Sequence, residues 1–270
     1  MCIISSMTSK NDQKLQLLMR EVRPGMVLTL NWLKHREISS KLAWWYVKSG
    51  WLERIAGGGA YKKVGDEVTW MGAVSALQYQ LGLPIYVGGK TALQLLGKAH
   101  YVPVAGLKQV VLYRTKHCNI SRWFKNTDWH VDLQIRTAKL FTGDQTDMLA
   151  ILEKKFGNIE LKLSAPERAI MEVLYHVPKY NTFHEAELLM EGLMQLRPNV
   201  MLKLLQNCSS IKTKRLLLYF AEKYDHPWLK DSDLTSVELG TGKIRIGDGG
   251  KYISKYKISI PRAVEDENEF

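Results

Sequence analysis

The sequence predicts an α+β protein in which an N-terminal winged helix-turn-helix domain is followed by a larger mixed α/β C-terminal domain. Two observations predict the first domain. Residues 39–50 form an amphipathic helical pattern, and residues 51–64 read as two short strands around three consecutive glycines. A third observation predicts the second domain, because strand-like alternation recurs between helical patterns beyond residue 66. We therefore expect domains at residues 1–66 and 67–264, and a frayed acidic tail at residues 265–270.

The chain is basic, and the excess charge is concentrated near its N-terminus. The 270 residues have a formal net charge of +11 and a pI near 9.4. Residues 1–66 hold 11 Lys and Arg against 5 Asp and Glu, whereas residues 67–270 hold 27 against 22. This distribution favours a polyanionic partner, meaning nucleic acid or an anionic membrane, for the N-terminal part.

The cysteine and histidine patterns give no indication of a disulfide framework or a metal site. Cys2, Cys118 and Cys208 are isolated, with no CxxC spacing, which is typical of free thiols in a reducing cytoplasm. The seven histidines show no HExxH or paired His/Cys spacing, so we expect no metal and no cofactor. The first seven residues are too short for a signal-peptide core, and no later apolar run reaches membrane-spanning length. We expect a soluble cytoplasmic protein.

Two helices are predicted before residue 35, and the first of them is expected to support the domain rather than to contact DNA. Ser9 is the expected cap of a first helix that ends at Pro24 and Gly25. Residues 26–28 are apolar and extended, and Thr29 is the expected cap of a short second helix. The apolar positions of these helices are Leu15, Leu18, Met19, Val22, Leu30 and Leu33.

The third predicted helix has one face suited to packing and another suited to binding. Ser39 is a natural N-cap and Gly50 a natural stop. A helical wheel places Leu42, Ala43, Tyr46 and Val47 on one face, and Lys41, Trp44, Trp45 and Lys48 on the opposite face. The order helix, strand, helix, helix, hairpin is that of a winged helix, so we interpret this helix as the DNA-reading helix.

The hairpin after this helix is the expected wing. Residues 51–56 and 60–64 read as its strands, and the glycines at 57–59 form its tip. In this interpretation serines and backbone amides at the helix start meet phosphates or base edges, lysines bind phosphate or guanine, and indoles contact thymine methyl groups. The expected contacts to duplex DNA are Ser39, Ser40, Lys41, Trp44, Trp45, Lys48, Arg54, Lys62 and Lys63. The alternative is that the two tryptophans belong to a protein interface or to an interdomain core.

The first part of the second domain contains a motif that resembles a phosphate loop. Asp66 is the expected start of a helix with Trp70 and Val74 on its apolar stripe, followed by a strand at 85–87, a turn at 88–89 and a helix at 90–96. Residues 89–91 read Gly-Lys-Thr, a combination that binds phosphate in Walker A loops. The first glycine of that motif would fall at Pro84, so the pattern does not predict phosphate binding.

The remaining elements alternate between strands and helices. Capping boxes are expected at residues 164–167 and 182–185. Strands are expected at residues 109–113, 129–135, 159–163, 237–239, 243–246 and 257–260. The first capping box is expected to open a helix that runs to about residue 175, and further helices are expected at 185–196, 200–206 and 213–224.

One three-residue pattern is compatible with nuclease chemistry. Glu160-Leu161-Lys162 matches half of a motif in which a carboxylate holds Mg²⁺ and a lysine supports the attacking water, with Asp132 or Asp147 as a second ligand. Polar residues must alternate on any amphipathic strand, so we interpret the pattern as structural and do not expect an enzyme.

Five groups of residues resemble a known family. They are residues 47–54 (VKSGWLER) with 59–61 (GAY), 86–97 (YVGGKTALQLLG) with His100-Tyr101, 163–169 (LSAPERA), 214–221 (KRLLLYFA) and 237–243 (VELGTGK). Together they resemble the AbiEi antitoxins over most of the chain. The three glycines at the wing tip depart from the more basic stretch found in that family.

The resemblance implies an antitoxin of a bacterial type IV toxin–antitoxin system that functions in abortive infection, a form of phage defence. Such a protein represses its own operon, and its C-terminal domain counters a nucleotidyltransferase-like AbiEii toxin, with or without direct contact. We expect the operator to contain inverted repeats, because winged helices commonly pair on two-fold sites. The alternatives are a transcriptional regulator without a toxin partner, or a Mg-dependent nuclease-like domain fused to a winged helix.

A second group of basic residues lies late in the chain. Its members are Lys212, Lys214, Arg215, Lys243 and Arg245, with Lys251, Lys255 and Lys257 beyond them. This group could form a second DNA surface, the antitoxin surface, or an ordinary solvated face.

Overall fold

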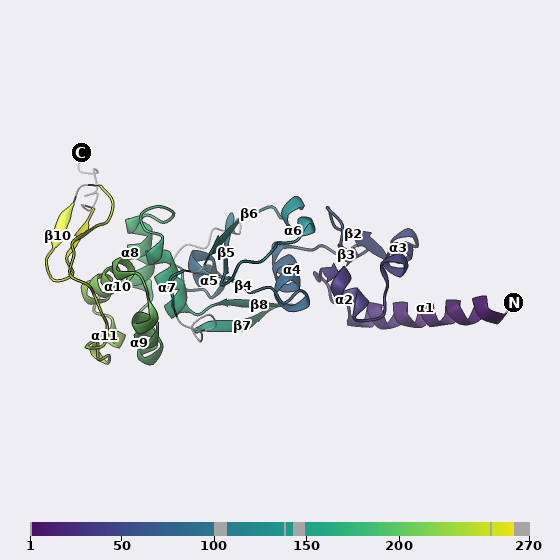
Figure 1. The fold of residues 1–270 in the computed structure, drawn as a ribbon, viewed down its shortest axis with the longest axis horizontal. Helices are drawn as coiled ribbons and strands as arrows, with labels where there is room; N and C mark the ends of the chain where they lie inside the picture. Colours follow the sequence, from purple (N-terminus) through teal and green to yellow (C-terminus); the bar gives the residue numbers. More distant parts are fainter. Residues whose placement is uncertain (1, 100–106, 138, 143–148, 249, 262–270) are drawn as a thin grey trace. The chain divides into compact units, whose positions relative to one another are not determined.

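The computed structural model describes residues 2–99, 107–137, 139–142, 149–248 and 250–261 (Figure 1). Two compact units are present. The first consists of Met1–Ile85, His117–Asp132 and Glu153–Lys162, and the second of Tyr86–Lys116, Leu133–Leu152 and Leu163–Phe270. The expected boundary between separately folding domains at residue 66 stays a prediction.

The N-terminal part of the first unit is the predicted winged helix-turn-helix. Its elements, with those that complete the unit, are α1 (Cys2–Glu21), β1 (Leu28–Thr29), α2 (Leu30–Lys34), α3 (Ser40–Lys48), β2 (Leu52–Arg54), β3 (Ala60–Lys63), α4 (Trp70–Ser75), the π-helix η1 (Ala76–Gln80) and α6 (Arg122–Asn126). The three short strands form an antiparallel sheet in the order β1-β3-β2. The helix order and the β2–β3 hairpin confirm the winged-helix prediction.

Two of the three predicted caps in this region are confirmed. The Thr29 hydroxyl accepts a hydrogen bond from the Trp32 amide at 3.2 Å, and the Ser39 hydroxyl accepts one from the Leu42 amide at 3.2 Å. The third prediction is wrong, because α1 begins at Cys2 and Ser9 lies inside it. No glycine or proline interrupts residues 2–8, so nothing in the local sequence stops the helix from extending.

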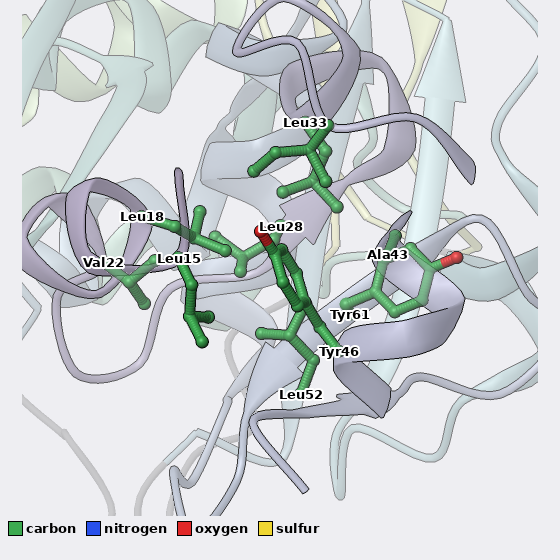
Figure 2. Packing of buried hydrophobic residues seen from close by; sticks show 10 residues of the cluster. Leu15, Leu18, Val22, Leu28, Leu33, Ala43, Tyr46, Leu52 and Tyr61 are labelled. Atoms are coloured by element: carbon green, nitrogen blue, oxygen red, sulfur yellow. The ribbon is translucent and has the colours of Figure 1, made fainter. Parts of the chain in front are cut away.

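A single apolar core holds α1, α2, α3 and the small sheet together (Figure 2). It comprises Leu15, Leu18, Val22, Leu28, Leu33, Ile38, Ala43, Tyr46, Leu52 and Tyr61. Tyr46 is fully buried at its centre, and its hydroxyl donates to the Asn11 carbonyl at 3.1 Å. Because α3 contributes two of these residues, its orientation is fixed by the core rather than by a ligand.

The helix expected to begin at Asp66 begins later, at Trp70. Asp66 belongs instead to the turn after β3, where its amide donates to the Lys63 carbonyl at 3.1 Å. The helix then continues as the π-helix η1, which the sequence pattern does not predict.

The side chains of two glutamines in η1 make hydrogen bonds to strand backbone that a neighbouring strand would otherwise make. Gln80 accepts from the Thr29 amide at 2.8 Å and donates to the Val27 carbonyl at 2.6 Å, so it satisfies the free edge of β1. Gln78 accepts from the Lys162 amide at 2.8 Å and donates to the Lys162 carbonyl at 2.9 Å. A π-helix has a wider turn than an α-helix, so the directions of its successive side chains differ from those in an α-helix. This geometry lets Gln78 and Gln80 reach two different strand segments. The winged helix is thereby joined to the strand segment 159–162 within the first unit.

The remaining helices and strands are β4 (Ile85–Val87), α5 (Gly89–Leu95), β5 (Gln109–Arg114), β6 (Asp132–Thr137), β7 (Ile151–Phe156), β8 (Ile159–Ser164), α7 (Pro166–Tyr175), α8 (Phe183–Gly192), α9 (Pro198–Asn207), α10 (Ile211–Lys223), α11 (Pro227–Lys230), β9 (Ile244–Arg245), β10 (Lys251–Ile253) and β11 (Ile258–Ile260). A five-stranded sheet has the order β6-β5-β4-β8-β7, and β4 runs parallel to β8. A three-stranded sheet has the order β10-β11-β9. The sequence pattern missed β7, β10 and α11, as well as α6 of the first unit.

The strand predicted from residue 129 begins three residues later, at Asp132. Trp129 is buried against Trp123 and Phe124, and its indole N–H donates to the Phe124 carbonyl at 2.8 Å. His130 then has a φ of 55°, which is incompatible with an extended strand. The alternation of apolar and polar residues therefore begins in the loop before β6, where Trp129 packs against α6.

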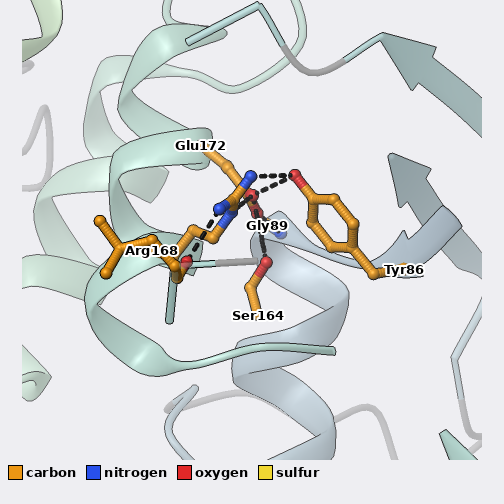
Figure 3. Close-up of polar contacts among 6 residues, drawn as sticks. Tyr86, Gly89, Ser164, Arg168 and Glu172 are labelled. Carbon is orange, nitrogen blue, oxygen red and sulfur yellow. Dashed lines mark hydrogen bonds and ion pairs between the residues drawn. The ribbon is translucent and has the colours of Figure 1, made fainter. Parts of the chain in front are cut away.

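A buried polar network centred on Glu172 joins β4, β8, α5 and α7 (Figure 3). The Glu172 carboxylate accepts from the Tyr86 hydroxyl at 2.9 Å, the Gly89 amide at 2.8 Å, the Ser164 hydroxyl at 2.9 Å and the Arg168 guanidinium at 3.1 Å. Arg168 and Glu172 are both almost fully buried, so the ion pair is stable only because these partners satisfy it.

This network overturns one predicted capping box. Ser164 binds Glu172 and makes no capping hydrogen bond, and α7 has Ala165 at its N-cap. The predicted box at Thr182 is confirmed, since the Glu185 amide donates to the Thr182 hydroxyl at 3.0 Å and the Thr182 amide donates to the Glu185 carboxylate at 3.0 Å.

Cys118 and Cys208 are free thiols, and burial raises the pKa of Cys208 to about 11. Among the described residues, none of the helices combines the length and the apolar character needed to cross a membrane.

Candidate nucleic-acid interface

Helix α3 exposes the face that the sequence predicts for DNA. Ala43 and Tyr46 are fully buried, while the Trp44 and Trp45 side chains are 50% and 46% exposed. Lys41 and Lys48 are exposed on the same side as the indoles, and Ser39 and Ser40 are exposed at the helix start. Large apolar side chains are rarely left in water in this number on one short helix unless they contact a partner.

The exposed cations of this face have no acidic partner among the described residues, whereas other cations of the same unit do. Lys14 pairs with Glu37 at 3.0 Å, and Lys162 pairs with Glu153 at 3.5 Å. Lys48 instead lies over the Trp44 ring, 5.4 Å from its centroid. A cation–π contact leaves the ammonium protons available to an incoming phosphate.

The cations of the β2–β3 hairpin differ in whether they are bound to other residues of the protein. Lys62 is held by the Glu53 carboxylate at 3.1 Å and the Asp66 carbonyl at 2.9 Å, and the hydrogen bond from Lys62 lowers the pKa of Glu53. Arg54 and Lys63 are exposed and pair with no carboxylate in the described part of the chain. The sequence predicts the same DNA contact for Lys62 and Lys63. In the structure the Lys62 ammonium group already binds Glu53 and the Asp66 carbonyl, whereas Lys63 has no such contact among the described residues.

The tip of the hairpin lies against α6. Gly57, Gly58 and Gly59 all have positive φ, between 75° and 85°. A Cβ atom on Gly57 would lie 3.2 Å from backbone atoms of Arg122 and Trp123. The glycine tip therefore allows a close backbone contact. The contact also places α6, with its exposed Arg122 and Lys125, beside the wing. The sequence carries no local signal for this neighbour, since the two segments are far apart along the chain.

The late basic group does not form one surface, and that interpretation is wrong for Lys214 and Arg215. Lys214 is 5% exposed and donates to the Glu238 carbonyl at 3.1 Å. Arg215 is 2% exposed and donates to the carbonyls of Leu239, Gly242 and Lys257. These two cations satisfy the carbonyls of residues 238, 239, 242 and 257.

The same contacts explain why residues 237–239 are not the predicted strand. Their carbonyls at 238 and 239 accept from side chains of α10, so they are not part of a sheet ladder. Lys212 is half-buried and donates to the Tyr175 carbonyl at 2.8 Å. Lys243 and Arg245 are exposed, and Arg245 pairs with Asp248 at 3.6 Å.

The nuclease alternative gains no support from the described residues. They contain no group of three His, Cys, Asp or Glu side chains that could hold a metal ion. Lys162 is paired with Glu153 and lies over the Tyr79 ring, 5.1 Å from its centroid. Asp147 lies outside the described residues, as do His100 and Tyr101 of the family resemblance.

Comparisons with known proteins agree with this architecture. Residues 11–104 match the N-terminal domain of the AbiEi antitoxin transcriptional regulators, and residues 107–261 match the AbiEi antitoxin transcriptional regulator domain of type IV toxin–antitoxin systems. The crystal structure of the RV2827C protein from Mycobacterium tuberculosis has the same fold, with a TM-score of 0.58 and 13% sequence identity, over 90% of this chain and 88% of that one. No curated protein gives a significant match. The two family matches cover most of the chain, which therefore belongs to the AbiEi family of transcriptional regulators, the antitoxins of type IV toxin–antitoxin systems.

Proposed function

We propose that this protein binds operator DNA in the promoter of its own operon through α3 and the β2–β3 wing, and thereby represses that operon. The observation that carries the proposal is the division of α3 into a fully buried face and a face of exposed lysines and indoles. A helix held by its core on one side and left open on the other is suited to enter a major groove.

The electrostatic pattern supports the same role. The proposed phosphate contacts are Lys41, Lys48, Arg54 and Lys63, with Arg122 and Lys125 of α6 beside the wing tip. Phosphate contacts supply affinity that is independent of sequence, and the indoles add apolar contacts to base edges. Inverted repeats in the operator would match two copies of the winged helix related by a two-fold axis.

Gel shifts test this part of the proposal. We expect the full-length protein to bind duplex DNA from the region upstream of its own operon more tightly than a scrambled duplex of the same length and composition. Equal affinity for the two duplexes at physiological salt would leave only the non-specific electrostatic term and would contradict operator recognition.

We further propose that the protein counters a nucleotidyltransferase-like AbiEii toxin, and that this activity is separate from repression. Family membership supports the toxin partner. The separation is testable with the full-length variant Lys41→Ala/Lys48→Ala, which should bind the operator more weakly and keep its fold, since both side chains are exposed.

The rescue experiment uses a toxin expressed from an unrelated promoter, so that repression cannot reduce its synthesis. We expect the double variant to restore growth as well as the wild-type protein does. Rescue by the wild-type protein alone would tie antitoxin activity to DNA binding. Rescue by neither protein would favour a transcriptional regulator without a toxin partner.

A further inference from the structure

The second unit contains a basic cavity that DNA binding by α3 does not use. Its volume is about 230 Å³, and it is lined by α5, β5, β6, residue 108 before β5 and residue 181 before α8. The residues that give it chemical character are Lys90, Thr91, Lys108, Tyr113, Arg136 and Asn181. No carboxylate is among the residues that line the cavity.

The three cations are held in different ways. Lys90 pairs with Glu185 at 2.7 Å, so one positive charge is offset. Arg136 donates to Gln134 at 2.8 Å and lies over the Tyr180 ring at 4.5 Å, which orients its guanidinium. Lys108 is exposed at the rim and has no ion pair among the described residues. The three cations and Glu185 together have a net charge near +2, which would balance the charge of about −2 on a phosphate monoester at neutral pH.

Tyr113, which lines the same cavity, has a buried hydroxyl that lacks an acceptor. Tyr113 is 2% exposed, and its hydroxyl makes no hydrogen bond of acceptable geometry with the described residues. The nearby Arg136 guanidinium acts to lower the pKa of Tyr113, because its charge stabilises the phenolate. A guanidinium only donates hydrogen bonds, so it cannot accept one from the Tyr113 hydroxyl. Burial outweighs this effect and raises the pKa of Tyr113, so the hydroxyl keeps its proton. An unsatisfied donor of this kind is uncommon in a protein interior.

The surroundings of Tyr113 carry an excess of positive charge. The His176 ring lies 5.9 Å from the Tyr113 ring. Burial, and then the charges of Arg136, Lys212 and Lys179, lower the pKa of His176 to about 4. The nearby Glu172 carboxylate is already committed to the Gly89 amide and to the network of Arg168. That commitment also explains why the Gly-Lys-Thr segment is not a phosphate loop, since an internal carboxylate binds the amide of Gly89.

We propose that this cavity binds the phosphate group of a small phosphorylated molecule, such as a mononucleotide. Arg136 and Lys108 bind the phosphate oxygens, and the Tyr113 hydroxyl donates its unpaired proton to one of them. Thr91 and Asn181 also line the cavity. The site is independent of the operator-binding function proposed above.

Isothermal titration calorimetry of the full-length protein tests the proposal with three probes: inorganic phosphate, adenosine 5′-monophosphate and adenosine. We expect both phosphate-containing probes to bind and adenosine not to bind. Tighter binding of the monophosphate than of inorganic phosphate supports a nucleotide-like ligand, and equal binding supports recognition of the phosphate alone. Arg136→Gln should weaken binding at least roughly tenfold, because it removes a charge-assisted contact. The control Lys203→Gln removes an exposed charge from α9 and should leave binding unchanged.

The unpaired hydroxyl provides a second readout. Tyr113→Phe should weaken phosphate binding by roughly fivefold to tenfold and leave the thermal midpoint of the free protein unchanged or higher. Tyr86→Phe is the matched contrast, because its hydroxyl donates to Glu172 at 2.9 Å, and it should lower the midpoint. Binding of adenosine as tight as that of the monophosphate would overturn the proposal. So would absence of phosphate binding, unchanged affinity in Arg136→Gln, or a Tyr113→Phe variant as destabilised as Tyr86→Phe.

Discussion

Gly57 at the tip of the β2–β3 hairpin lies directly against the backbone of Trp123 in α6, so close that a Cβ atom would be 3.2 Å from the Trp123 Cα. The contact connects the wing to a helix from a distant part of the sequence. It indicates that α6 supports the wing, and that Gly57 is required by packing as well as by turn geometry.

Substitution of the tip glycines separates these two requirements. Gly57 and Gly59 have nearly the same φ, 82° and 85°, but a Cβ on Gly59 would meet no atom within 4 Å. Gly59→Ala should cost about 1 kcal/mol from backbone strain alone. Gly57→Ala should cost about 1 kcal/mol more, because the α6 backbone must move. Urea unfolding measures both values, and equal losses would show that the α6 contact is not maintained in solution.

Removal of the two lysines on α3 tests the phosphate contacts. Lys41→Ala/Lys48→Ala should weaken binding to every duplex and lower the slope of log affinity against log salt by about 1.8, or roughly 0.9 for each lost contact. The matched control Lys154→Ala/Lys155→Ala removes two exposed lysines of the same unit from β7. A slope that falls equally in both variants would argue against α3 as the specific contact surface.

Two aromatic residues of α3, Trp44 and Tyr46, should affect different properties of the protein. Trp44→Ala removes a half-exposed indole, so it should change the free energy of unfolding by less than about 0.5 kcal/mol. It should reduce the preference for operator over scrambled DNA by about 1 kcal/mol. Tyr46→Ala empties the centre of the core and should cost about 3–5 kcal/mol of stability. If Trp44→Ala alters self-association and leaves DNA preference intact, the indoles form a protein interface instead.

The two wing lysines provide a further matched pair. Lys63 is exposed and unpaired among the described residues, whereas Lys62 is bound to Glu53 and the Asp66 carbonyl. Lys63→Ala should lower the salt slope of DNA binding by about 0.9, and Lys62→Ala should leave it nearly unchanged. Titrations at four salt concentrations give both slopes. A larger effect of Lys62→Ala would mean that Lys62 leaves Glu53 when DNA binds.

His176 should make the protein less stable in mild acid. Its pKa is about 4 in the folded state, chiefly because of burial, and about 6.5 when unfolded. Between these values the unfolded chain binds a proton that the folded protein does not, so stability falls as pH drops from 6.5 to 4 and then levels off for this group. Burial also lowers the pKa of His226, which adds to the effect in the same direction.

Urea unfolding at pH 7, 5.5 and 4 measures this dependence. His176→Gln should reduce the loss of stability across the window by about 1–2 kcal/mol. The control His184→Gln changes a side chain that is 75% exposed on α8 and should retain the wild-type profile. A wild-type profile in His176→Gln would place the acid sensitivity elsewhere.

The sequence by itself determined the elements whose stabilising contacts are local. The caps at Thr29 and Ser39 and the capping box at Thr182 join residues three positions apart, so a short pattern contains both partners. The two faces of α3 follow from helical periodicity in the same way. Family membership also followed from short segments of sequence, and the domain matches confirm it.

Only the tertiary structure decided which polar side chains are free to bind. Ser164 has the pattern of a cap but binds Glu172. Arg215 has the composition of a basic surface but is itself buried and donates to the carbonyls of residues 239, 242 and 257. In each case the partner comes from a part of the chain that short-range periodicity does not reach. A buried charge or hydroxyl must find a partner wherever the fold provides one, because leaving it unpaired costs more than a local hydrogen bond returns.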